Sequence, residues 1–314
     1  MTSTTSGTKV TLLAGGVGAA RLLRGLADVV EARDLTVIVN TGDDEEFYGL
    51  HVSPDIDTIL YTLAGVAPPG RGWGVQGDTF RALGALERLY GQAWFQLGDR
   101  DLATHIFRTE KMKRGWPLSR CVRALAEAHG VRAVVLPATD DRLRTQIDTA
   151  EGRLAFQTYL VRRRARPRVR AIRYDGGSRA RPAPGVVEAI ERADVILIAP
   201  SNPFVSIGPI LAVREVRRAL RKNAARVVAI SPLVGGRAIK GPLAEMLRAL
   251  GQRADTTALA RFYRGLARTL IVAPGDAPRT IPRGFPRIVE HDIVIARRPA
   301  ARKLARFALG AAQA

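Results

Sequence analysis

Short runs of aliphatic and β-branched residues recur along the chain, and each ends in small or polar residues that lead into a helical pattern. This alternation is typical of parallel βαβ units. The clearest junctions follow the runs at 9–14, 35–40, 194–200, 226–232 and 269–274. We therefore expect an α/β fold with a doubly wound, mostly parallel, Rossmann-like sheet. Because ligands bind beyond the carboxyl ends of such strands, the loops after these runs should share one crevice.

The segment between the second and third junctions has a different pattern. It is helical from 78 to 130 and then contains strand-like pieces at 132–136, 153–160 and 168–173. We expect residues 78–179 to form a smaller, inserted helical and β region. Residues 1–77 and 180–314 should form the Rossmann-like α/β core.

The composition is that of a globular protein. With 314 residues, 46% of them hydrophobic, the chain can bury a large core. Its apolar runs are far shorter than the ~20 residues of a membrane helix, and its N-terminus lacks the apolar segment of a leader peptide. A soluble, cytoplasmic protein is expected. The single cysteine, Cys121, excludes an internal disulfide, and the four histidines are too scattered for an HExxH zinc motif.

The charge balance is strongly basic. The 49 Lys and Arg residues against 29 Asp and Glu give a net charge of +20, which suits nucleic acid, a membrane surface or a small polyanionic substrate. The densest basic run, 161–170, holds six arginines, with only Tyr159 and Tyr174 beside it as stacking aromatics. We interpret this run as a solvated strand edge, where charge discourages edge pairing, rather than as an RNA-binding surface.

A glycine-rich turn, AGGVGAARLLRGL at 14–26, follows the first strand-like run and opens a helical pattern. Glycines at such a turn let the backbone approach a phosphate at the helix N-terminus. The turn does not fit the G-x-G-x-x-G/A fingerprint of nicotinamide dinucleotide sites. When Gly16 and Gly18 are taken as its first two glycines, Arg21 occupies the position of the third. The second strand also ends in Asn40, where that fingerprint has the Asp or Glu that binds the ribose. We predict a phosphate or nucleotide loop of another kind, with tight strand-to-helix packing as the alternative.

Acidic residues gather after the second strand, at Asp43 and Asp44, and at the start of the next predicted helix, at Asp55 and Asp57. An acid in the first turn of a helix is favourable to the helix dipole, which is enough to explain Asp55. Asp43 should lie on the crevice side of the sheet. Since Mg²⁺ is commonly held by one or two carboxylates plus substrate phosphates, we predict that Asp43 and Asp57 share one Mg²⁺.

Three further segments carry polar groups. Residues 94–110 contain Arg100 and Arg108, which offer an anion clamp, and the titratable His105. Residues 200–209 and 231–242 follow buried strands and are rich in small residues, so they can present backbone N–H and hydroxyl groups to a base or a phosphate. Simple turns and a hydrogen-bonded structural histidine are the alternatives.

In their order along the chain, these motifs resemble the 2-phospho-L-lactate transferases of coenzyme F-420 biosynthesis. The matching segments lie between residues 10 and 275 and read GGVGAARLLRGL, VIVNTGDD, SPDIDTILYTLAG, LGDRDLATHIFRT, APSNPFVSIGPIL and SPLVGG with KGPLAEML. The resemblance implies transfer of a phosphorylated three-carbon acid from a guanosine diphosphate conjugate to the ribitol hydroxyl of the deazaflavin Fo, with release of GMP. It also implies a Mg²⁺ requirement and a homodimer. Nucleic acid and membranes are not expected as partners.

Carried over residue by residue, the resemblance makes Asp43 and Asp57 the catalytic and metal-binding residues, one of them acting as base. The substrate-binding residues that it implies are Gly15, Gly16, Gly18, Asn40, Thr41, Asp55, Gln96, Asp99, Arg100, His105, Ser201, Asn202, Ser231 and Gly235. The donor acid is left open among 2-phospholactate, phosphoenolpyruvate and 3-phosphoglycerate.

The chain departs from the family pattern near its C-terminus. The run at 269–274 ends in Ala273 and Pro274, where many family members have an acid. Residues from about 277 onward match weakly, and they predict a surface strand followed by a basic helix.

Two other functions stay open. A related group with the same N-terminal glycine turn consists of regulatory proteins that bind nucleotide sugars, although an acid pair able to hold a metal favours the enzyme. The third hypothesis is an RNA-binding protein that uses the arginine run, and it requires a steeply salt-dependent affinity for RNA.

Overall fold

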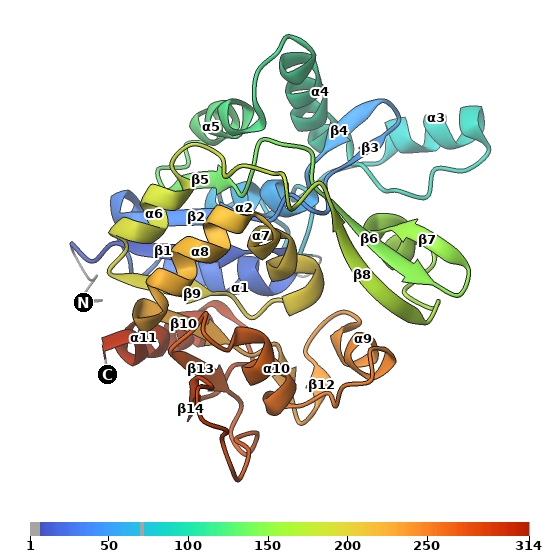
Figure 1. Ribbon diagram of the computed structural model, residues 1–314. Helices are drawn as coiled ribbons and strands as arrows, with labels where there is room; N and C mark the ends of the chain where they lie inside the picture. Colours follow the sequence, from blue (N-terminus) through green and yellow to red (C-terminus); the bar gives the residue numbers. More distant parts are fainter. Residues whose placement is uncertain (1–6, 70–71, 314) are drawn as a thin grey trace.

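The computed structural model describes residues 7–69 and 72–313, and its centre is a seven-stranded sheet (Figure 1). The strands follow the order β14-β13-β10-β9-β1-β2-β5. Their bounds are β1 (Val10–Ala14), β2 (Leu35–Val39), β5 (Val134–Pro137), β9 (Val195–Ile198), β10 (Val227–Ile230), β13 (Thr269–Val272) and β14 (Arg287–Glu290). Every neighbouring pair is parallel, which confirms the predicted α/β sheet.

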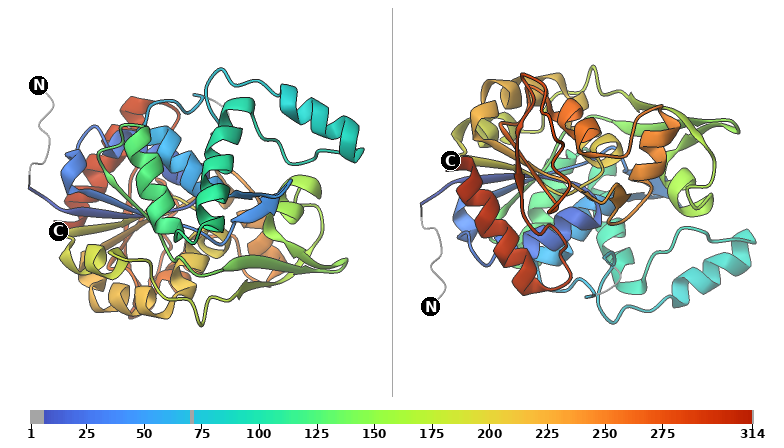
Figure 2. Two further views of the ribbon diagram at one scale, coloured as in Figure 1. Left: turned by 90° about the horizontal axis from the view of Figure 1, so that it is seen from above. Right: turned by 90° about the horizontal axis from the view of Figure 1, so that it is seen from below.

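Helices cover both faces of this sheet, as Figure 2 shows from above and below. One core lies under α1 (Gly16–Leu26), α2 (Pro54–Leu63), α5 (Leu118–Ala128) and α11 (Arg298–Gln313). The core on the opposite face is formed with α6 (Val186–Arg192), α7 (Gly208–Ala212), α8 (Arg214–Lys222), α9 (Leu243–Ala249) and α10 (Thr256–Tyr263). Because both faces are covered, the central strands are continuous aliphatic runs, such as VILI in β9, with every residue buried.

The strand order reverses at β1. This strand pairs with β2 on one side and with β9 on the other, so the chain winds outward in both directions from it. The loops that follow β1, β2 and β9 therefore diverge and leave a crevice at the carboxyl ends of the strands.

The region expected as one insertion, 78–179, is divided by the fold. Its strand β5 pairs with β2, and α5 packs against the same core, so residues 118–137 belong to the main sheet layer. The parts that project from this layer are α3 (Arg81–Tyr90) and α4 (Asp99–Lys113), and a separate antiparallel sheet. That sheet has the order β7-β6-β8, formed by β6 (Arg144–Thr149), β7 (Gly152–Ala155) and β8 (Val169–Asp175).

Short elements complete the connections. Two hairpins pair β3 (Glu45–Phe47) with β4 (Leu50–Val52) and β11 (Leu233–Val234) with β12 (Arg237–Ala238). The π-helices are η2 (Thr158–Arg162) and η3 (Pro203–Ile207), and the 3₁₀ turns are η1 (Ala32–Asp34) and η4 (Ala224–Arg226).

The C-terminal segment is part of the core. The strand and helix predicted for it are confirmed as β14, at one edge of the sheet, and α11. Helix α11 packs against α1, with Ala301, Leu304 and Ala308 in the shared core. At Gly25 of α1, an added Cβ would overlap the backbone of Ala301. The two helices therefore cross at a distance that only glycine allows.

No helix within the described ranges has the length and apolar character needed to cross a membrane. Residues 1–6, on which part of the leader-peptide expectation rests, lie outside the described residues.

Candidate active site

The loops at the topological switch point enclose a cavity of about 670 Å³, a size typical of small-molecule sites. Its walls include the glycine turn after β1, acidic residues after β2 and at the start of α2, and residues after β9. The projecting regions add residues at 94–97 and 156–161. The segment between β14 and α11 also reaches the cavity, where it contributes Ile293 and Ile295.

The glycine turn is packed tightly against the loop after β9. An added Cβ on Gly18 would overlap the Pro200 carbonyl oxygen, and one on Gly15 would lie 2.8 Å from Ser206 Cβ. Ser201 joins the two segments, because its Oγ donates to the Gly15 carbonyl oxygen at 2.6 Å. Packing therefore explains part of the glycine pattern. The same turn also lines the cavity.

Asp55 lies against the N-terminus of α1. Gly16, at φ +70°, donates its backbone N–H to Asp55 Oδ1 at 2.7 Å. A carboxylate of the protein therefore uses one of the N–H groups that the sequence suggested for a phosphate, and it gains from the positive end of the helix dipole.

Asn40, which follows β2, joins two carboxylates. Its Nδ2 donates to Asp43 Oδ1 and to Asp55 Oδ2, each at 2.8 Å. Its Oδ1 accepts the Gly42 N–H at 2.8 Å, which fixes the orientation of the amide. Since Asn40 is 0% exposed, this amide holds the two acids in one arrangement at the cavity wall.

Burial raises the pKa of both acids. The pKa of Asp43 lies well above its usual value, because of burial first and of the neighbouring Asp55 charge second. Burial raises the pKa of Asp55 to about 6, although the hydrogen bonds from Asn40 and Gly16 oppose this. A cation between these carboxylates would relieve the cost of their buried negative charge.

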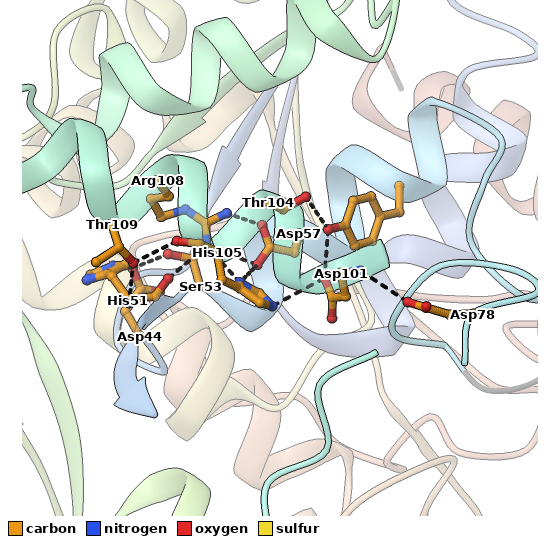
Figure 3. Close-up of polar contacts among 11 residues, drawn as sticks. Asp44, His51, Ser53, Asp57, Asp78, Asp101, Thr104, His105, Arg108 and Thr109 are labelled. Carbon is orange, nitrogen blue, oxygen red and sulfur yellow. Dashed lines mark hydrogen bonds and ion pairs between the residues drawn. The ribbon is translucent and has the colours of Figure 1, made fainter. Parts of the chain in front are cut away.

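Asp57, on α2, is paired with Arg108 on α4 (Figure 3). Arg108 Nη1 donates to Asp57 Oδ2 at 3.1 Å, and Nη2 donates to Oδ1. Burial raises the pKa of Asp57, while the charges of Arg108 and His105 oppose the rise. Burial would lower the pKa of Arg108, but the Asp57 charge outweighs it and the net shift is upward. Arg108, predicted as part of an anion clamp, thus contacts a carboxylate of the protein.

His105 bridges two acids. Its Nδ1 lies 3.6 Å from Asp57 Oδ2, and its Nε2 lies 3.3 Å from Asp101 Oδ1. Tyr61 donates its hydroxyl to Asp101 Oδ1 at 2.7 Å. Burial by itself would raise the pKa of Asp101, but the adjacent His105 imidazole and the hydrogen bond from Tyr61 leave it below its usual value.

The acids differ in how well they suit a magnesium ion. Asp57, Asp101 and His105 present ligand atoms within 4.8 Å of one another. Arg108 already balances the charge of Asp57 in that group, however, and an imidazole is a poor ligand for a hard cation. The buried carboxylates of Asp43 and Asp55 fit Mg²⁺ better. That Asp43 and Asp57 share one ion stays a prediction, and both residues line the cavity.

Basic and aromatic side chains also line the cavity. Arg21 and Lys240 line the cavity, and burial, followed by the Arg21 charge, lowers the pKa of Lys240. Trp73, Trp94 and Phe95 line it as well, and Phe95 stacks on Phe47 with ring centroids 3.7 Å apart. A polyanion and a planar ring are the chemical groups that such walls suit.

The structure brings most of the predicted site residues to this cavity. Those that line it are Gly15, Gly16, Gly18, Asp43, Asp55, Asp57, Gln96, His105, Ser201 and Asn202. Asn40 and Thr41 are buried beside them. The sequence prediction omitted Asp101, Arg21, Lys240 and the two tryptophans. The spacing of Asp101 and His105, four residues apart on a helix, was the available signal for Asp101.

Four predicted residues have other contacts. The Asp99 carboxylate accepts the Ala82 N–H at 3.0 Å and the Arg81 N–H at 3.1 Å, at the start of α3. Arg100 donates to the Gln76 carbonyl oxygen at 3.2 Å. Ser231 Oγ accepts the Leu233 N–H at 3.0 Å, and the Gly235 N–H donates to Asp276.

The sequence matches the family model described as "2-phospho-L-lactate transferase CofD" over residues 10–284. It is 43% identical over 257 residues to a 2-phospho-L-lactate transferase of Methanopyrus kandleri, covering 82% of each chain. It is 44% identical over 275 residues to a phosphoenolpyruvate transferase of Streptomyces griseus, covering 86% of each. A phosphoenolpyruvate transferase of Mycolicibacterium smegmatis is 41% identical over 277 residues, covering 83% of this chain and 85% of the relative.

Among solved structures, a member of the UPF0052 family from Bacillus halodurans is similar with a TM-score of 0.62. The alignment covers 96% of this chain and 99% of the other, at 18% sequence identity. At this identity the likeness shows the shared α/β fold alone.

Proposed function

Because this chain belongs to the CofD family of 2-phospho-L-lactate transferases, we propose that it acts in coenzyme F-420 biosynthesis on the deazaflavin Fo. The donor would be a guanosine diphosphate conjugate of a phosphorylated three-carbon acid. The terminal ribitol hydroxyl of Fo attacks the phosphorus that carries the acid, the bridging P–O bond to the guanylyl group breaks, and GMP leaves. The hydroxyl proton goes to a carboxylate of the site.

The observation that carries this proposal is the shared cavity, which has four buried carboxylates, two cationic side chains and an aromatic surface among its lining residues. Phosphoryl transfer depends on alignment of the reactants and on neutralisation of charge more than on a strong nucleophile. Arg21 and Lys240 would bind the negatively charged groups of the donor. Trp73, Trp94 and Phe95 would flank the ring system of Fo.

The acids have different proposed roles. Asp43 would bind Mg²⁺ together with Asp55, which the geometry favours, or with Asp57, which the sequence predicts, and the bound ion would neutralise charge on the diphosphate. Asp57 would also orient the ribitol hydroxyl and accept its proton. Asn40 would keep Asp43 and Asp55 directed at the cavity, and Ser201 and Asn202 would orient the donor.

The donor acid is 2-phospholactate, phosphoenolpyruvate or 3-phosphoglycerate. Relatives named for the first and for the second are similarly close to this chain, at 43% and 44% identity. We further propose that the protein is cytoplasmic and works as a homodimer, which light scattering of the purified protein would check.

The test is incubation of the purified protein with Fo, Mg²⁺ and each guanylylated acid in turn, followed by mass spectrometry of the deazaflavin. One donor should give a product heavier than Fo by the phosphorylated acid, together with stoichiometric GMP. No product with any of the three donors, combined with binding of a nucleotide sugar but not of Fo, would favour a regulatory binding protein instead.

A further inference from the structure

Arg108 is the largest fully buried side chain in the described part of the molecule, with 0% of its side chain exposed. Both of its terminal nitrogens bind the Asp57 carboxylate, one to each oxygen. Nη1 also lies 3.3 Å from the His51 carbonyl oxygen, which it contacts as a donor. Figure 3 shows the guanidinium and the carboxylate directed at each other between α4 and the start of α2.

The two partners occupy different positions relative to the cavity. Asp57 lines it, whereas Arg108 is not among the described residues that do so. Arg108 therefore lies behind Asp57 as seen from the cavity. A ligand in the cavity would touch the carboxylate and not the guanidinium.

Arg108 forms a fork of two hydrogen bonds, one to each oxygen of Asp57, and this fork restricts the orientation of the carboxylate more than a single positive charge would. Two nearly parallel hydrogen bonds fix the plane of a carboxylate, while an ammonium group in the same place supplies one contact point. His105 Nδ1 lies 3.6 Å from Oδ2, the same oxygen that Arg108 Nη1 contacts. Asp57 is thereby held in one orientation by groups of α4.

We propose that Arg108 is a positioning residue, which fixes the orientation of the Asp57 carboxylate toward the cavity and so contributes to turnover without touching substrate. The inference rests on the proposed function, because it assigns Arg108 to the same transfer reaction. A reaction that needs its groups aligned loses about a hundredfold in rate from small misplacements.

The experiment compares four variants with the unmodified chain: Arg108→Lys, Arg108→Met, Asp57→Asn and the double variant Arg108→Met/Asp57→Asn. Arg108→Lys keeps the charge but loses the fork, so kcat should fall about 10–100-fold while KM for the donor changes less than about threefold. Arg108→Met should lower kcat about as much as Asp57→Asn does. The double variant should be no slower than Asp57→Asn, because residues that act as a unit are not additive.

Thermal melting gives a readout that does not depend on activity. Arg108→Met leaves a buried carboxylate without its partner and should lower Tm by about 6–10 °C. Asp57→Asn in the same protein removes that unpaired charge, so the double variant should melt above Arg108→Met.

Arg226→Met is the matched control, since Arg226 donates to the Ala193 carbonyl oxygen at 2.6 Å, away from the cavity. It should lower Tm and leave kcat unchanged. If Arg108→Met does not fold, Arg108→Lys carries the kinetic test.

A wild-type kcat in folded Arg108→Lys, or losses that multiply in the double variant, would overturn the inference. Absence of transfer by the unmodified chain would overturn the proposed function instead. In that case the Tm values still test the coupling of Arg108 to Asp57, which losses of Tm that simply add would refute.

Discussion

Replacement of Asn40 by alanine should destabilise the protein more than most substitutions of a buried polar residue. The side chain is 0% exposed, and its amide donates to one oxygen of Asp43 and one of Asp55, each at 2.8 Å. Hydrogen bonds to charged groups contribute about 1.5–3 kcal/mol each, so the loss of two corresponds to about 3–6 kcal/mol. The Gly42 N–H also loses its acceptor. We expect the free energy of unfolding to fall by about 4 kcal/mol at pH 8.

The loss should be smaller at low pH. Burial raises the pKa of Asp55 to about 6, and the pKa of Asp43 is also well above its usual value. The Asp55 carboxyl is then largely protonated at pH 5, and the raised pKa of Asp43 shifts that carboxyl in the same direction, whereas bonds to neutral groups contribute only about 1 kcal/mol each. The expected loss at pH 5 is therefore about 2 kcal/mol.

The assay is urea denaturation followed by circular dichroism at both pH values, without Mg²⁺. Asn223→Ala is the control, because this buried asparagine donates to the Ala219 carbonyl oxygen at 2.8 Å and accepts from Arg226, so it has no carboxyl partner. It should cost about 2–4 kcal/mol, equally at both pH values. A loss in Asn40→Ala below about 1 kcal/mol at pH 8, or one that is equal at both pH values, would refute the argument that the amide serves two ionised acids.

Three further predictions concern the cavity. Gly18→Ala should destabilise the chain by about 2 kcal/mol in thermal melts, because the added Cβ overlaps the Pro200 carbonyl oxygen. Gly310→Ala is the control, since an added Cβ there has no atom within 4 Å, and equal Tm values for the two variants would contradict the prediction. The pKa of Asp55 is about 6 in the folded protein and 3.8 for an ordinary Asp, so the folded state binds more protons than the unfolded state between these pH values. The folded state therefore has about 3 kcal/mol of stability below pH 4 that is lost as the pH rises through 6. If Asp55 is a ligand of Mg²⁺, the ion should therefore raise Tm more at pH 8 than at pH 5. An equal rise at both pH values would exclude Asp55 as a ligand. Trp94→Ala should raise KM for Fo about tenfold with little change in kcat, and Trp116→Ala, outside the cavity lining, should leave both unchanged; a fall in kcat alone would count against stacking.

The sequence predicted the main sheet because its strands are continuous aliphatic runs, a pattern typical of parallel strands covered on both faces. Strand β6 was missed for the opposite reason. Its sequence RTQIDT buries alternate residues, and two of the three buried ones are threonines, so no aliphatic run marks it. Strand β5 lies within the region predicted as an insertion, yet it pairs with β2 of the main sheet. A residue pattern predicts that a strand exists but not which sheet it joins.

The site could be predicted in part because strand ends converge. Asp43, Asp55 and Asp57 follow from the positions of strand and helix ends, and all three line one cavity. Their partners did not follow. The ion pair of Asp57 and Arg108 joins residues 51 positions apart, and only the packing of α4 against the start of α2 determines it. Asp99 likewise accepts hydrogen bonds from backbone N–H groups at the start of α3. The sequence predicts a helix there but not that it packs beside Asp99.

The family model ends at residue 284, yet Ile293 and Ile295 beyond it line the cavity, and α11 covers the apolar side of α1. A chain shortened to the matching segment would lose part of the cavity wall and would expose the apolar side of α1 to solvent. Residues beyond the matched segment thus complete both the wall of the cavity and the apolar core behind the glycine turn.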